Sequence, residues 1–155
     1  MSEVENILDQ LKRVYDGQAV HGPSLRESLA DLSAEQAAAQ PLPRAHNIWE
    51  LVLHLAAWNN VFSRRLEGHE ADEPEVGDFP PTNEISREGW AAALKELHQA
   101  HQRLLALVAA LSVARLQEIT PGRDYSLRFM LEMIIRHYVY HTGQIALLRK
   151  AFVAL

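Results

Sequence analysis

Residues 136–145, RHYVYHTGQI, lie inside an apolar segment without proline that extends from about residue 127 to residue 152. Its apolar side chains recur at the spacing of one helical face, which predicts a single long helix. The members of this face are Leu127, Met130, Leu131, Ile134, Ile135, Tyr138, Ile145 and Leu148. Helical residues four positions apart lie on the same side of the axis, so His137 and His141 point in one direction and can share a metal ion.

This histidine pair alone does not establish a metal site, because the same spacing also occurs in helices that bind nothing. Met130, Met133 and Ile134 neighbour His137 on the helical wheel, which places the pair on or beside the buried face. Tyr138 stands where zinc peptidases with a His-Glu-x-x-His helix carry glutamate, so that class of peptidase is disfavoured. A metal site therefore needs a third ligand from another part of the chain.

The composition indicates one globular domain covering residues 1–155. A hydrophobic share of 48% in 155 residues is enough for a core and argues against disorder. The net charge of −5 and the lack of a basic patch disfavour nucleic acid as a partner. The chain has no cysteine, which excludes disulfides, a thiol nucleophile and cysteine metal ligands and fits a reducing compartment.

Neither a targeting segment nor a membrane anchor is expected from the sequence. The opening residues, MSEVEN, are acidic and unlike a signal peptide. No apolar run approaches the roughly 20 residues that a membrane span needs. We therefore expect a cytoplasmic protein without a membrane partner.

Capping motifs and apolar periodicity predict four main helices with short accessory pieces. Ser2 with Glu5, and Asn47 with Glu50, have the spacing of capping boxes. The predicted main helices cover residues 2–15, 48–66, 86–111 and 127–152. Residues 24–32 either continue the first helix after a kink or form a short helix of their own, and short helical turns are expected after Ser33 and over residues 112–117. No strand is predicted, so we expect an all-α, up-down-up-down four-helix bundle.

The longest break in this pattern runs from residue 68 to residue 81 and is predicted to be a solvent-exposed loop. It is rich in glycine, proline and acidic residues, which end helices and favour turns. Its acidic cluster, Asp72, Glu73 and Glu75, is more typical of a soluble surface than of a metal site.

The remaining histidines are weighed by their surroundings. His54 shares a predicted helical face with Leu51 and Trp58, which is typical of a core residue but also suits a third ligand from a facing helix. His98 and His101 are three positions apart and could also share a metal, but Lys95, Glu96, Gln99 and Gln102 favour a surface location. His21, His46 and His69 are expected in turns or loops. We predict that these five other histidines are dispensable for metal binding.

Two motifs resemble the DinB-like four-helix bundle proteins, a group that includes the YfiT-type metal-dependent hydrolases. Residues 48–58, IWELVLHLAAW, resemble their second helix, and residues 137–145 resemble their fourth. Residues 21–26, HGPSLR, are similar to a segment found in one branch. The resemblance implies a metal site formed by His54, His137 and His141, which would hold a divalent transition ion, most often zinc or nickel. Three imidazoles with open positions are typical of catalytic sites.

The resemblance further implies a small-molecule substrate and a homodimer. Related branches are transferases or isomerases that use low-molecular-weight thiols of the bacillithiol or mycothiol kind, and others are assigned as hydrolases. No carboxylate stands at a diagnostic spacing for a general base, and Glu50 is better explained as a cap. Thiol transfer needs such a base less, because metal coordination itself activates a thiol.

The alternative is a non-catalytic, metal-binding stress-response bundle. Metal affinity should fall below pH about 6.5, where free histidine becomes protonated.

Overall fold

Side-chain caps determine where most helices begin. The computed structural model describes residues 1–82 and 84–153, so the expected domain end at Leu155 lies outside it. Capping boxes are formed at Ser2, Ser24, Ser33 and Asn47. The helices are α1 (Glu3–Asp16), α2 (Leu25–Leu29), α3 (Ala34–Ala38), α4 (Ile48–Leu66), α5 (Arg87–Ala109), the 3₁₀ helix η1 (Val113–Gln117) and α6 (Leu127–Val153). The predicted all-α class is confirmed, and the described residues contain no strand beyond an isolated bridge.

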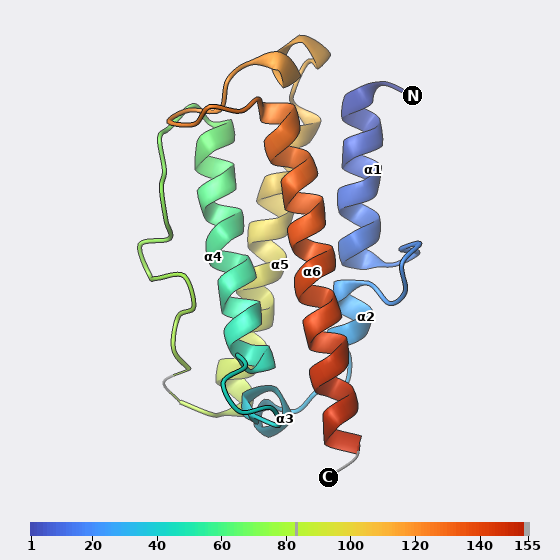
Figure 1. Ribbon diagram of the computed structural model, residues 1–155, viewed down its shortest axis with the longest axis vertical. Helices are drawn as coiled ribbons and strands as arrows, with labels where there is room; N and C mark the ends of the chain where they lie inside the picture. Colours follow the sequence, from blue (N-terminus) through green and yellow to red (C-terminus); the bar gives the residue numbers. More distant parts are fainter. Residues whose placement is uncertain (83, 154–155) are drawn as a thin grey trace.

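The four long helices α1, α4, α5 and α6 pack side by side as a bundle (Figure 1). In this view α4 and α5 both run upward, while α1 and α6 run downward. Contacts between side chains agree with these directions. Trp49 and Trp90 meet near the starts of α4 and α5, with ring centroids 5.3 Å apart. Glu67 and Arg103 meet towards their ends at 2.9 Å. The predicted alternation of directions is therefore wrong at one step: α4 and α5 are parallel.

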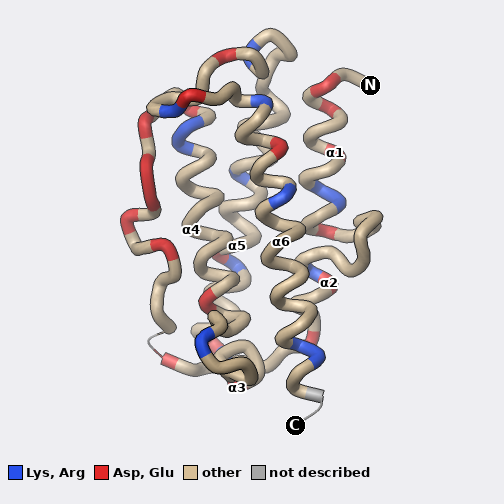
Figure 2. Tube along the Cα trace, in the orientation of Figure 1, with Lys and Arg blue, Asp and Glu red and all other residues tan. Residues whose placement is uncertain are grey.

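The parallel pair requires a connection that returns along the outside of the bundle. Residues 67–82 and 84–86 lie on this connection, and acidic residues are spaced along it (Figure 2). At its start the buried Arg65 guanidinium donates to the carbonyl oxygens of Ala71 and Asp72, at 2.8 and 3.0 Å. The acidic cluster lies at the surface as predicted, and two of its members pair with arginines.

A polar network crosses the otherwise apolar core. The Asn59 amide donates to the hydroxyl oxygen of Tyr138 at 2.6 Å, and that hydroxyl lies 2.9 Å from Nδ1 of His101. Tyr15 stacks on His101 at 3.8 Å between ring centroids. The predicted surface location is correct for His98 but wrong for His101, which is fully buried. His101 shares a helical face with Leu97, Leu104 and Val108, and this position outweighs its polar neighbours in sequence.

None of the described helices combines the length and the apolar character that a membrane span requires. The cytoplasmic location remains a prediction.

Candidate metal centre

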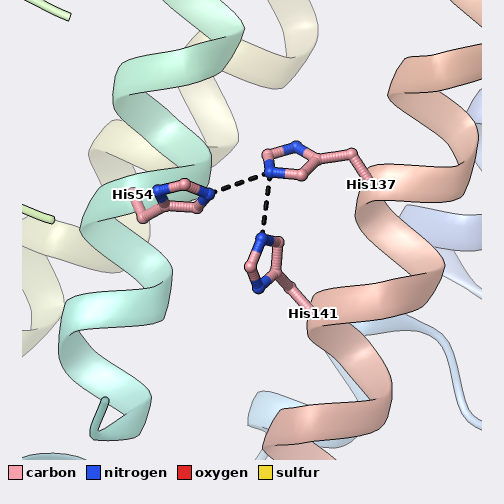
Figure 3. A group of neighbouring side chains, drawn as sticks. All are labelled: His54, His137 and His141. Atoms are coloured by element: carbon pink, nitrogen blue, oxygen red, sulfur yellow. Dashed lines mark hydrogen bonds between the residues drawn. The ribbon is translucent and has the colours of Figure 1, made fainter. Parts of the chain in front are cut away.

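Three histidines from the antiparallel helices α4 and α6 converge in the space between these helices (Figure 3). His54 extends from α4, and His137 and His141 extend from successive turns of α6. The Nε2 atom of His137 lies 2.9 Å from Nε2 of His54 and 3.0 Å from Nε2 of His141. His54 and His141 are buried and His137 is partly exposed. The convergence expected from the sequence is thus present, while metal binding itself stays a prediction.

The outer hydrogen bonds of the triad determine where its protons are held. Nδ1 of His54 lies 2.7 Å from the backbone carbonyl oxygen of Asp78, and Nδ1 of His141 lies 2.6 Å from Oε1 of Gln144. Carbonyl oxygens only accept, so both imidazoles carry their proton on Nδ1. Their Nε2 lone pairs therefore face each other across His137. A single proton on Nε2 of His137 can be donated to only one of these two lone pairs. The three Nε2 atoms are therefore suited to binding a cation.

Burial keeps these imidazoles neutral. Removal from water lowers the pKa of His137 to about 3 and that of His141 to about 4. Burial also lowers the pKa of His54, although its hydrogen bond to Asp78 opposes the shift. Neutral imidazole is the form that binds metal. Protons should therefore compete with metal at a lower pH than the value of about 6.5 expected for an unperturbed histidine.

A cavity of about 370 Å³ lies directly beside the triad. All three histidines line it, and the remaining wall is mostly aromatic or apolar: Trp58, Phe62, Phe79, Met133 and Tyr140, with Asp78. A volume of this size suits a small-molecule ligand. We name this cavity the Trp58 lobe.

Phe79 closes one side of the site through a stack of three rings. Its ring lies 4.2 Å from that of His54 and 3.6 Å from that of His46, and both pairs are nearly parallel. His46 lies in a loop as expected, but the connection after α4 brings Phe79 against its ring, a contact that the sequence did not predict. His46 still contributes no atom to the three-histidine group.

Asp78 and Gln144 are the site residues that sequence reasoning missed. The Asp78 carboxylate lies 3.2 Å from Nδ1 of His54 and accepts a hydrogen bond from Nε1 of Trp58 at 2.7 Å. Trp58 follows His54 by one helical turn, so its indole N–H signalled a need for an acceptor near the site. Gln144 follows His141 by three positions, a spacing at which helical side chains meet.

The other histidines stay apart from the triad. His21, His69 and His98 are exposed, and His101 is buried in the polar network of the core. Within residues 1–82 and 84–153, the one group of three or more potential metal ligands is His54, His137 and His141. That the five histidines outside this group are dispensable for metal binding stays a prediction.

The fold and site define an all-α bundle whose largely buried three-histidine group is able to hold a metal ion. The family model of the DinB superfamily matches residues 21–145, which include all three histidines. The chain therefore belongs to the DinB superfamily. No curated protein and no solved structure matches it.

Proposed function

We propose that this protein is a divalent-metal-dependent enzyme that transfers a low-molecular-weight thiol to a small apolar substrate. The observation that carries the proposal is the pair of inward Nε2 lone pairs on His54 and His141, beside an open cavity. We further propose zinc or nickel as the metal, since both accept imidazole nitrogen. A divalent ion held by three imidazoles leaves positions for substrate and lowers the pKa of a thiol or water there.

The residues of the chain have distinct roles in this proposal. Asp78 and Gln144 hold the Nδ1 protons of two ligands and so fix which nitrogen faces inward. Trp58, Phe62 and Met133 form an apolar wall that suits an uncharged group.

Thiol transfer is favoured over hydrolysis because the site offers no uncommitted base. Among the described residues that line the Trp58 lobe, Asp78 is the one carboxylate, and it already accepts from Trp58 and faces His54. Glu50, the other candidate from the sequence, accepts from the backbone N–H of Asn47 and pairs with His46. Hydrolysis would need such a group to take a proton from water.

The proposal is tested first by metal binding. Protein purified without a polyhistidine tag should retain metal in stoichiometric amount through dialysis. Added zinc or nickel should raise the melting temperature, since a ligand at a hundredfold excess over Kd adds about 2.7 kcal/mol. His137→Ala should lose most of this rise, while His69→Ala, which removes an exposed histidine, should keep it. An equal response in wild type and His137→Ala would place metal elsewhere.

A panel of electrophiles offered with bacterial thiols then separates an enzyme from a metal-holding protein. Product that requires both the thiol and His137 supports the transferase. A stoichiometric metal site without turnover on any electrophile would favour the non-catalytic alternative. Hydrolysis of the same compounds without thiol would favour the hydrolase.

A further inference from the structure

A second cavity borders the triad at His141. This second cavity has a volume of about 380 Å³ and shares Phe79, Tyr140 and His141 with the Trp58 lobe. Arg44 and Gln144 stand in its wall, so we name it the Arg44 lobe. His141 thus lines two cavities whose other walls differ, while His54 and His137 line the Trp58 lobe alone.

The two lobes differ in charge. No acidic residue lines the Arg44 lobe among the described residues, whereas the Trp58 lobe contains Asp78. The guanidinium of Arg44 is exposed and has no hydrogen bond or ion pair within the described part of the chain. Gln144 accepts from His141 through Oε1, which leaves its amide N–H groups available as donors. The Arg44 lobe therefore presents a cation and neutral donors without a competing carboxylate.

The backbone at Arg44 is held in a conformation that L-residues rarely adopt. Its φ of 68° lies in the left-handed region. The side chain of Gln40 fixes the turn by donating to the carbonyl oxygen of Ala45 at 2.7 Å. Non-glycine residues in this region are unfavourable and concentrate at functional sites. The turn thus fixes the backbone from which the Arg44 side chain extends at the wall of the lobe.

We propose that the Arg44 lobe selects an anionic thiol, whose carboxylate pairs with Arg44 while its sulfur lies at the shared edge by His141. This inference rests on the proposed function and deepens it by naming the class of thiol. Arginine binds carboxylates through paired hydrogen bonds, which orients the ligand as well as attracting it. The opposite lobe stays available for the apolar substrate.

The test compares three small probes on zinc-loaded protein by titration calorimetry, with zinc content measured after each titration. The probes are 3-mercaptopropionate, the uncharged 2-mercaptoethanol, and propionate, which has the charge without sulfur. Arg44→Gln should weaken binding of 3-mercaptopropionate about twofold to fivefold at low salt and leave 2-mercaptoethanol unchanged. Arg136→Gln removes an exposed arginine that pairs with Glu132 outside both lobes, and should change neither value.

The outcomes distinguish the role of Arg44 from the binding of a thiol as such. An equal effect of Arg44→Gln on both thiols, or no effect on either, overturns the role of Arg44 while leaving thiol binding intact. If neither thiol binds wild type more tightly than propionate does, thiol recognition fails and the proposed function with it. Propionate binding that depends on Arg44 would then support an anion site without a thiol. If Arg136→Gln weakens binding of 3-mercaptopropionate as much as Arg44→Gln does, the effect comes from net charge and the inference is overturned.

Discussion

Asp78 touches the triad through both its backbone carbonyl and its carboxylate, so its replacement tests how the ligands are oriented. Asp78→Ala keeps the carbonyl but removes the acceptor for Trp58 and the charge near His54. Loss of such outer contacts typically weakens metal binding by 10–100-fold, and because the carbonyl remains we expect about tenfold. Competition with a chromogenic chelator measures this change.

Asp72→Ala is the matched control for this experiment. Asp72 lies in the same connection, is exposed and pairs with Arg123, away from the triad. The Asp72→Ala variant should leave zinc affinity unchanged. Equal losses in the two variants would mean that the charge of the connection matters, and not the contact between Asp78 and His54.

His101 should make the fold sensitive to acid. Burial lowers its pKa to about 4, whereas an unfolded histidine titrates near pH 6.5. Between these values the unfolded chain binds more protons, so stability is present above pH about 6.5 and is lost as pH falls. From about pH 7 to about pH 5, metal-free wild type should lose about 2 kcal/mol more than His101→Gln does. Urea unfolding at both pH values measures the difference.

His69→Gln provides the comparison, because His69 is exposed on the connection. It should show the same acid sensitivity as wild type. A His101→Gln protein with an unchanged pH dependence would assign the acid sensitivity to other groups.

At the scale of residues, the sequence predicted the members of the triad better than their supports. His137 and His141 are linked by helical spacing, and the resemblance supplied His54. Asp78 and Phe79 lie in a connection without periodicity, so no pattern related them to His54. His101 was misplaced because its immediate neighbours were weighed above its helical face.

At the scale of elements, Arg65 anchors the 67–86 connection to the end of α4. Arg65→Met removes the buried guanidinium that donates to the carbonyls of Ala71 and Asp72, and leaves Arg123 as their remaining charged donor. We expect a loss of about 2–3 kcal/mol in the free energy of unfolding and faster proteolysis within residues 68–81. Because Asp78 and Phe79 lie on the same connection, zinc affinity should fall as well.

Arg64→Met is a close control for this effect. Arg64 is the neighbouring residue, but it is exposed and pairs with the exposed Glu75. Such surface pairs contribute little to stability. Proteolysis that is equally fast in both variants would show that the connection is not held by Arg65.

Helix boundaries could be predicted because the caps are local. Asn47 and Glu50 form the predicted capping box from residues only three positions apart. The relative direction of α4 and α5 could not be predicted in this way. A long connection can either turn over at one end or return along the bundle, and tertiary contacts such as those of Arg65 decide between these paths.

For the whole molecule, we still predict a homodimer. Phe129, Tyr140 and Leu147 are large apolar residues on α6 that are 47%, 64% and 61% exposed, which is consistent with a further partner surface. Light scattering at micromolar concentration should give the mass of two chains. A monomeric mass at that concentration would contradict the prediction.

The two helices that carry the triad are far apart in the chain, since 83 positions separate His54 from His137. During synthesis on the ribosome, His54 emerges while α6 is still missing. One imidazole binds a divalent ion weakly, so the nascent chain has no means of capturing metal early. On the proposed function, the ion is acquired only after translation has passed α6 and the bundle has closed. The identity of the metal is then decided by the cellular supply that the folded protein meets.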